Sequence, residues 1–454
     1  MNIKHFKNMF IFIIIFLILT GIYIIYIKDN LGSEGVQAGN KKNKITKEII
    51  IGITEFDTLN PIKTKSLEMQ HLTKLIYEPL IDITQDFNTK PVIAEEFSKI
   101  DNLTYIIKLN ENKKWQNGEN VKFEDIEYTI NTIKESDSVY KENVEEIEKI
   151  EKISENTFKI YLNKEVSFFE YLLCFPIIKA NDVDGKIGTG QYKLHTVSGD
   201  TIVLQNEGSK IEIKIHESVA ELYNAFSKEK IDLMITQNIN YEEYIGKIGY
   251  NETIIPGREF YYILCENIED AEERKQINQY INKEKLIYDL YNKKYIVADS
   301  PLGYGSYLNK SKEKEYKENK IKQKTYTLSN KIENKEIAEK IKEQLEEKGI
   351  KINILNYETE KADLILKQKT MSITPNLNEI LKNEEIKKIE KIENKEILKE
   401  EYSKILETYY EEAPFISLYF NSYIILRNNK LKGDFTGNWY NFFYNIETWY
   451  VNHV

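Results

Sequence analysis

The sequence is poor in the residues that most often mark chemical sites. Among its 454 residues are two cysteines, three tryptophans and five histidines. The histidines are widely separated, and no two have the spacing of metal ligands: His5, His71, His195, His216 and His453. Neither a His-Glu-x-x-His motif nor a Gly-x-Ser-x-Gly motif occurs. We therefore predict no enzymatic activity, no metal and no cofactor.

The sequence also lacks a phosphate-binding loop and a basic surface for nucleic acid. The stretch Gly185-Lys186-Ile187-Gly188-Thr189-Gly190 does not have the Gly-Lys-Ser/Thr ending of a P-loop, so we expect its Gly-Thr-Gly part to form a structural turn. The 63 basic and 73 acidic residues give a net charge of −10. This negative net charge argues against nucleic acid as a partner. We interpret it mainly as a contribution to the solubility of the protein.

One long hydrophobic run stands at the N-terminus. Residues Met9 to Ile27 are almost entirely apolar, and a helix of about 20 such residues spans a bilayer. Lys4 and Lys7 precede the run, which favours an N-terminus inside the cell and the bulk of the chain outside. A cleaved signal peptide is the alternative. Its hydrophobic region is usually shorter, and no small-x-small site follows Ile27, so we favour an uncleaved anchor.

The two cysteines, Cys174 and Cys265, each lie in an apolar stretch. An extracytoplasmic protein can form disulfides. Pairing requires a geometry that spacing cannot show, so we expect two buried thiols.

Hydrophobic periodicity beyond the first 46 residues predicts an α/β protein. Short apolar or alternating runs predict strands at 49–53, 104–109, 157–162, 210–215, 260–265, 351–355 and 362–366. Apolar faces at helical spacing predict helices at 219–230, 271–292 and 337–345, and two more within 378–412. Gly349 is placed to end one of them. The charge-rich residues 310–324 are expected to form a surface loop or a short solvated helix.

A series of motifs carries more specific information. In Lys114-Trp115-Gln116-Asn117-Gly118, an aromatic residue ends a strand and Asn-Gly makes a tight turn; an acidic pair, Glu124-Asp125, then opens a helix. Further motifs follow the same chain order: Leu59-Asn60-Pro61, Tyr77-Glu78-Pro79-Leu80, Gly188-Thr189-Gly190-Gln191-Tyr192, Ala298-Asp299-Ser300-Pro301-Leu302-Gly303 and Ala413-Pro414-Phe415. From about Lys47 to the C-terminus the chain resembles the family 5 extracellular solute-binding proteins, the receptors for oligopeptides, dipeptides and nickel chelates that serve ABC importers.

The resemblance implies a two-lobed α/β fold of the periplasmic-binding-protein type (type II, cluster C), with an extra subdomain and, here, one preceding transmembrane helix. The expected parts are a membrane anchor or signal segment at 1–28, a linker at 29–46, a first lobe at 47–258 plus 426–454 with a subdomain at about 77–176, and a second lobe at 259–425. Strand crossings near Glu259 and Leu426 would form the hinge.

The same resemblance suggests ligand-binding residues. Glu55 and Phe56 follow the first strand, where the family commonly places cleft residues. Tyr77, Trp115 and Tyr304 are aromatic candidates by position, with core packing as the competing interpretation for the first two. Arg258 is a candidate for holding a ligand carboxylate, and a salt bridge within the hinge is its alternative.

The segment after strand 362–366 departs from the family pattern. Many peptide-binding relatives carry a tryptophan and an aspartate near this point, and in oligopeptide receptors the aspartate holds the peptide's amino terminus. Here the sequence is Lys367-Gln368-Lys369-Thr370-Met371. If Lys367 faces the cleft it favours an anionic group; the alternative is a solvated lysine. Recognition of a peptide through the usual amine clamp is therefore not expected.

These observations predict a receptor at the cell surface, of the Gram-positive type, that spans the membrane once and has most of its chain outside. It would capture a small solute, best fitted by an oligopeptide, and deliver it to the permease of an ABC importer. A receptor that senses a peptide and signals to a membrane partner, or a scaffold that has lost its ligand contacts, is the alternative. A peptidase would need a nucleophile or metal cluster that the sequence does not supply.

Overall fold

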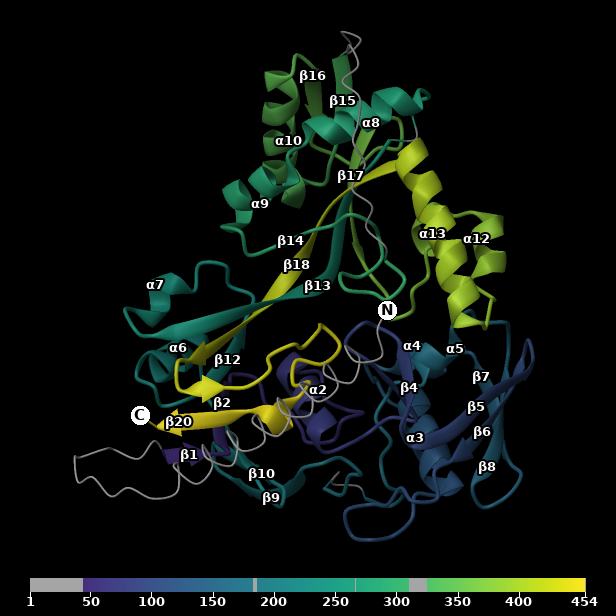
Figure 1. Ribbon diagram of the computed structural model, residues 1–454, viewed down its shortest axis with the longest axis vertical. Coiled ribbons are helices and arrows are strands. Elements are labelled where there is room, and N and C mark those ends of the chain that lie inside the picture. Colours follow the sequence, from purple (N-terminus) through teal and green to yellow (C-terminus); the bar gives the residue numbers. More distant parts are fainter. Residues whose placement is uncertain (1–43, 183–185, 266, 310–324, 454) are drawn as a thin grey trace, which may run out of the picture. The chain divides into compact units, whose positions relative to one another are not determined.

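The computed structural model describes residues 44–182, 186–265, 267–309 and 325–453 (Figure 1). The predicted anchor and the predicted loop at 310–324 lie outside these ranges. Within them, no helix is both long enough and apolar enough to cross a membrane. Most strands join one 11-stranded sheet, whose main path runs β16-β15-β17-β13-β18-β12-β2-β11-β10-β9.

One end of the large sheet is built on the predicted first strand. β2 (Glu48–Ile53) lies parallel to β11 (Lys210–Ile215) and β12 (Leu233–Thr236). β10 (Thr201–Gln205) and β9 (Lys193–Ser198) continue the sheet in antiparallel pairing. Helix α6 (Val219–Ser227) begins at Ser218, whose hydroxyl accepts a hydrogen bond from the Glu221 N–H at 3.2 Å, as an N-cap does. Its buried face packs with Ile231 and Met234.

The other end of the sheet is a smaller α/β layer. β15 (Thr325–Ser329) lies parallel to β16 (Lys351–Leu355) and to β17 (Leu364–Thr370). Helix α10 (Lys335–Glu347) connects β15 to β16 and buries an apolar face, and the chain leaves it at Gly349 with φ +84°. α8 (Ala271–Tyr280), α9 (Lys283–Tyr291) and the short β14 (Ile296–Val297) complete this part.

Two long antiparallel strands join these ends. β13 (Tyr250–Leu264) pairs with β18 (Phe415–Asn428) from Tyr250↔Asn428 to Leu264↔Phe415. In Figure 1 the two strands run side by side from α6 and α7 (Glu242–Ile245) toward the part that carries α8 and α10. All residues of β18 except one are buried, as expected for a central strand covered on both faces. These are the two crossing strands that the two-lobed arrangement requires.

A second, separate sheet forms most of the segment that the sequence analysis assigned to the subdomain. It has the order β5-β6-β8-β7 and is antiparallel throughout. Its strands are β5 (Ala94–Asp101), β6 (Thr104–Leu109), β7 (Ile147–Lys152) and β8 (Thr157–Leu162). The same segment contains the β3 (Ile81–Ile83) and β4 (Thr89–Pro91) pair and the helices α3 (Phe123–Glu135), α4 (Lys141–Val144) and α5 (Phe169–Leu172).

The remaining elements are short apart from one helix. They are β1 (Lys44–Thr46), α2 (Leu67–Leu72), η1 (Thr73–Leu75), η2 (Ile332–Asn334), α11 (Asn378–Leu381), α12 (Glu384–Ile389), α13 (Lys395–Glu412), β19 (Leu431–Lys432), η3 (Ile446–Thr448) and β20 (Tyr450–His453).

Most predicted elements are confirmed, and the differences have local causes. Residues 378–412 form three helices rather than two, because Lys382 adopts φ +46° and ends the first of them after one turn. The strand predicted at 260–265 is the final part of the longer β13. The strand predicted at 362–366 begins and ends later, at Leu364–Thr370. Both cysteines are buried and unpaired, as expected, and burial raises the pKa of the Cys174 thiol to about 11.

The motif around Trp115 is a structural junction. The buried Asp125 carboxylate accepts hydrogen bonds from the Trp115 indole N–H (3.0 Å), the Lys122 N–H (3.0 Å) and the Ala180 N–H (2.8 Å). These bonds connect the segment before α3 with the turn at Ala180, which follows α5 along the chain. One carboxylate therefore satisfies three donors that burial would otherwise leave without partners.

The Gly-Thr-Gly stretch closes the same junction. Gln116 binds the backbone of Gly188, Gly190 and Tyr192 through its side-chain amide, at 3.2, 3.0 and 2.7 Å. A Cβ atom at Gly188 would lie 1.8 Å from the Ile76 carbonyl oxygen. Glycine is therefore required for close backbone approach, as the sequence analysis expected, and not for binding phosphate.

We expect Asp125→Ala to lower the free energy of unfolding by roughly 2–4 kcal/mol, because it leaves three donors in the junction without an acceptor. Urea unfolding followed by circular dichroism measures the change. Asp137→Ala is the matched control, since this carboxylate is almost fully exposed and, within the described ranges, is paired with Lys65 alone, at 3.0 Å. It should change the stability by less than about 0.5 kcal/mol. Equal effects of the two substitutions would refute the junction role.

Candidate functional site

A small cavity lies beside the middle of β13, where the two crossing strands separate locally. Its walls come from the Gly257–Arg258 part of β13, residues 301–306, residues 371–377, and the aromatic residues Phe87, Phe420 and Trp439. About 30 Å³ is open to the centres of water-sized molecules, which is room for about two waters. This volume is too small for a ligand larger than water in this conformation, and such a ligand would need the cavity walls to part.

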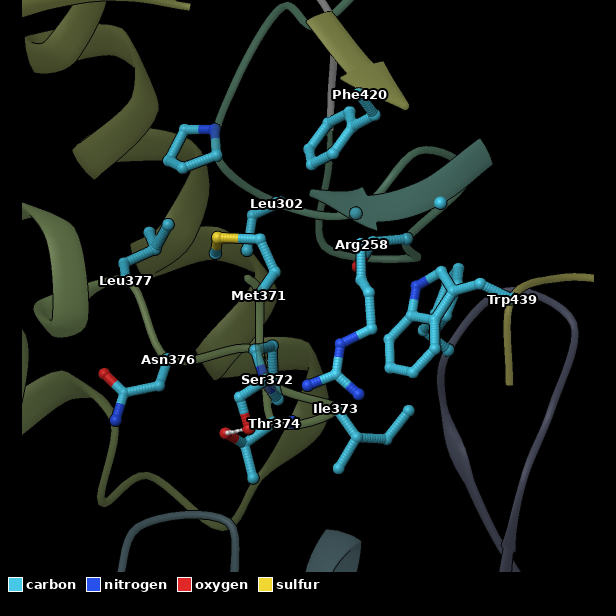
Figure 2. A pocket seen from close by; sticks show the side chains of 16 residues that line it. Arg258, Leu302, Met371, Ser372, Ile373, Thr374, Asn376, Leu377, Phe420 and Trp439 are labelled. Carbon is cyan, nitrogen blue, oxygen red and sulfur yellow. Dashed lines mark hydrogen bonds between the residues drawn. The ribbon is translucent and has the colours of Figure 1, made fainter. Parts of the chain in front are cut away.

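Arg258 is the charged residue of this cavity. In Figure 2 its side chain extends past the Trp439 ring toward Ser372, Ile373 and Thr374. The centre of the guanidinium group lies 5.3 Å from the centroid of the Trp439 ring, a cation–π contact. Arg258 is exposed and forms no ion pair with any residue that the structure describes. The alternative of a salt bridge within the hinge is therefore not found in the described chain.

The backbone at this point explains how Arg258 is presented. The pairing of β13 with β18 is interrupted between Pro256 and Phe260. Proline has no N–H for the ladder, and a Cβ atom at Gly257 would lie 2.1 Å from the Asn421 side-chain oxygen. That oxygen accepts the Glu259 N–H at 2.9 Å in place of a strand partner. The sequence Pro-Gly-Arg thus makes a bulge that turns the arginine out of the sheet.

The segment 371–377 forms the wall opposite the bulge. The Met371 N–H donates to the Arg258 carbonyl oxygen at 2.7 Å. The Thr374 hydroxyl donates to the Ser372 hydroxyl at 2.9 Å (Figure 2), and the Tyr402 hydroxyl donates to the Pro375 carbonyl oxygen at 2.6 Å. Hydroxyl groups and a cation on an otherwise apolar lining suit a ligand with an anionic end and an apolar body.

The seven residues proposed from the sequence are not gathered in one place. Arg258 lines the cavity. Tyr304 is exposed and lies between Gly303 and Ser306, which do line it. Glu55 and Phe56 are exposed beyond the end of β2 and belong to neither of the cavities described in this article.

Tyr77 and Trp115 lie in the hydrophobic core, 1% and 2% exposed. The Trp115 indole N–H is bound to Asp125, and the Gly-Thr-Gly turn covers this region. Core packing, the competing interpretation, therefore describes both residues.

The two lysines that the sequence analysis placed after the strand lie within β17 and are engaged by carboxylates. Lys367 forms ion pairs with Glu358 and with Glu360, the latter at 2.9 Å, and Lys369 pairs with Glu379 at 3.0 Å. Neither lysine lines the cavity. The cationic character of the site comes from Arg258.

Sequence reasoning missed most of the lining. Phe87, Met371, Ser372, Thr374 and Trp439 were not singled out. The segments 298–303 and 367–375 were noticed as family motif and departure from it, which points to the right loops. Trp439 belongs to none of the motifs noticed in the sequence, and only folding of the chain brings it beside Arg258.

Within the described ranges, no group of three or more His, Cys, Asp or Glu side chains is arranged to hold a metal ion.

Glu390 links the cavity loop to the helices behind it. Its carboxylate accepts the Asn378 N–H at 2.9 Å, directly after residues 371–377. The residue is 3% exposed. Burial raises the pKa of the carboxyl from 4.5 to about 7, against the opposing effect of the Asn378 and Leu377 N–H groups. The carboxyl is therefore partly protonated near neutral pH.

This pKa predicts a pH dependence of stability. A carboxyl that keeps its proton in the folded state while the unfolded chain has lost it stabilises the fold at low pH, and the contribution disappears as pH rises from about 4.5 to about 7. Glutamine does not titrate, so Glu390→Gln should not lose this contribution. As pH rises from about 5 to about 7.5, the free energy of unfolding of the variant should therefore increase by about 1–3 kcal/mol relative to that of the natural chain, as measured by urea unfolding. Glu400→Gln, an exposed change on α13, should show no such gain. Parallel pH profiles for all three proteins would contradict the assignment.

Comparison with known proteins gives the family of the chain. Residues 88–378 match the family model "Bacterial extracellular solute-binding proteins, family 5 Middle". A glutathione-binding protein, GsiB of Salmonella typhi, is 27% identical over 165 residues, which cover 33% of this chain and 32% of that protein. The match thus spans about a third of the length of this curated relative.

Solved structures show the same fold over nearly the whole chain. The unliganded open form of MppA, a periplasmic murein tripeptide binding protein, is similar with a TM-score of 0.75 at 14% identity, covering 91% of this chain and 99% of that one. A nickel ABC transporter structure from Bacillus halodurans gives 0.74 at 16% identity, covering 89% and 100%. The fold is the two-lobed α/β fold of the periplasmic-binding-protein type, and since the family model matches more than half of the sequence, the chain belongs to the family 5 extracellular solute-binding proteins, which serve ABC importers.

Proposed function

We propose that this protein captures a short peptide between its lobes, holds the peptide's terminal carboxylate at Arg258, and delivers it to an ABC importer. The observation that carries the proposal is the exposed guanidinium group of Arg258, which lines a cavity and has no ion-pair partner among the described residues. Arginine binds carboxylates through two parallel hydrogen bonds. The names of two similar proteins, which bind glutathione and a murein tripeptide, support a peptide of this size.

The remaining lining fits the body of a peptide. Met371, Leu302, Phe420 and Trp439 offer apolar and aromatic surface, and the Ser372 and Thr374 hydroxyl groups offer hydrogen bonds. Among the residues that the structure describes, no acidic side chain lines the cavity. A peptide would therefore be recognised through its carboxylate end, in agreement with the loss of the aspartate that holds the amine in oligopeptide receptors.

Closure of the two lobes around a ligand is supported by the lobes to which the lining residues belong. Residues 371–377 follow β17, in the predicted second lobe, whereas Trp439 comes after β18 has returned to the predicted first lobe. A ligand that contacts both stabilises the closed form by its greater affinity for that form. The bulge between Pro256 and Phe260 lies at the hinge predicted near Glu259, where β13 makes fewer bonds with β18.

We expect Arg258→Ala to weaken the binding of short peptides by at least about tenfold, since a charged hydrogen-bond pair contributes about 1.5–3 kcal/mol. Isothermal titration of the full chain in detergent should compare each peptide with its C-terminally amidated form. The natural protein should prefer the free acid, and the variant should lose this preference. Lys247→Ala, which removes a positive charge from an exposed position, is the control. Equal binding of acid and amide by the natural protein would rule out the carboxylate role.

We further propose that residues 9–27 remain attached and hold the protein at the outer surface of the membrane. The supporting observation is their length and apolar character, with Lys4 and Lys7 before them. The full chain should stay in the membrane fraction after alkaline carbonate extraction, whereas a chain starting at residue 46 should be released. A mature protein whose N-terminus lies beyond residue 27 by mass spectrometry would show cleavage instead.

A further inference from the structure

A second and larger cavity lies between the separate four-stranded sheet and the turn before α13. It has a volume of about 540 Å³, within the range of small-molecule sites. It shares no lining residue with the cavity beside Arg258. Between the two lies a hydrophobic cluster that includes Phe87, Leu302 and Leu377 of the first cavity and Phe168 of the second. The second cavity is therefore a site of its own.

Aromatic rings form one wall of this cavity. Tyr105 lies between Phe97 and Phe169, with ring centroids 5.2 and 4.8 Å from theirs. Phe168 adds a fourth ring and adopts φ 58°, a conformation that costs energy for a bulky residue. The wall offers an apolar face wide enough for an aliphatic or aromatic side chain.

Two glutamates in the cavity have unused binding capacity. The Glu170 carboxylate forms no hydrogen bond or ion pair with another side chain in the described chain, and burial raises its pKa above the ordinary value. Glu165 uses one oxygen for Lys391, at 2.6 Å, while its other oxygen is buried and has no hydrogen-bond partner among the described residues. This unsatisfied buried oxygen of Glu165 calls for a donor.

Two lysines in the cavity also lack a close carboxylate. Lys99 has a side chain that is 16% exposed, and within the described residues it forms one ion pair, with the exposed Glu393 at 3.8 Å. Lys395 donates instead to neutral groups, the Asn88 side-chain oxygen at 2.5 Å and the Thr89 hydroxyl at 2.9 Å. Burial lowers the pKa of Lys395, and the nearby charge of Glu170 opposes this effect.

The cavity thus presents charges of both signs. Glu165 is paired with Lys391, whereas Glu170, Lys99 and Lys395 have no ion pair shorter than 3.8 Å within the described residues. A simple organic cation would be repelled by the two lysines, and a simple anion by the glutamates. A ligand that carries one charge of each sign satisfies both sets. The aromatic wall then accommodates the rest of such a ligand.

We propose that this cavity binds a free α-amino acid with an apolar side chain, whose ammonium group meets Glu170, whose carboxylate meets Lys99 and Lys395, and whose side chain packs on Phe97, Tyr105 and Phe169. The site is separate from the cleft beside Arg258 and does not depend on the function proposed there.

Isothermal titration of the full chain in detergent tests the proposal with L-phenylalanine and two analogues. Phenethylamine lacks the carboxylate, and 3-phenylpropionate lacks the ammonium group. We expect the amino acid to bind at least about tenfold more tightly than either analogue. No binding of L-phenylalanine at millimolar concentration, or equal binding of all three compounds, would overturn the proposal.

Variants locate the site. Glu170→Gln and Lys99→Met should each weaken L-phenylalanine binding at least about tenfold. Both are made so that the test still holds if one of the two variants fails to fold. Glu142→Gln, an exposed change on α4 of the same segment, should leave binding unchanged. Arg258→Ala should also leave it unchanged, which separates this site from the peptide cleft. Retained affinity in both Glu170→Gln and Lys99→Met, or loss of affinity in Arg258→Ala, would refute the assignment.

Discussion

The pairing of β13 with β18 is the constraint on which the rest of the fold depends. These two strands carry the chain between the lobes and form the centre of the 11-stranded sheet. Their ladder is broken at one place, between Pro256 and Phe260, where proline lacks a donor and Gly257 makes room for Asn421. The break turns Arg258 toward the cavity and reduces the bonds that resist bending. A single local departure from regular strand geometry thus presents a charged side chain to the cavity and interrupts the pairing of the two strands at one position.

Many lysine and glutamate side chains of this protein form ion pairs with one another, so charged groups without such a pair in the described chain are conspicuous. The chain is rich in lysine and glutamate, and many of these residues form exposed pairs, such as Lys108 with Glu95 at 2.8 Å, that contribute little to stability. Even Lys367 and Lys369, which lie near the cleft in sequence, are held by glutamates. Against that background, two groups stand out because they form no ion pair within the described chain: an exposed arginine on one cavity wall and Glu170 on the other.

The family motifs around Trp115 and the Gly-Thr-Gly turn have a structural role in this chain. Trp115, Gln116, Asp125 and the Gly-Thr-Gly turn form one hydrogen-bonded junction. A junction of this kind needs particular side chains at particular spacings, so its motif is recognisable in a sequence. Ligand contacts are under no such common constraint, since each receptor recognises a different solute. The residues that identify the family are therefore poor guides to the ligand.

The sequence by itself determined the α/β class, the family, most strands and helices, and the burial of both cysteines, because these follow from hydrophobic periodicity and from motif order along the chain. It also pointed to Arg258. Only the tertiary structure decided that Trp439 lies beside that arginine, that Tyr77 and Trp115 are core residues, and that Lys367 is paired. It alone brought Glu170 and Lys395 to one cavity. Burial and ion pairing depend on which distant segments meet, and that is set by long-range packing rather than by local pattern.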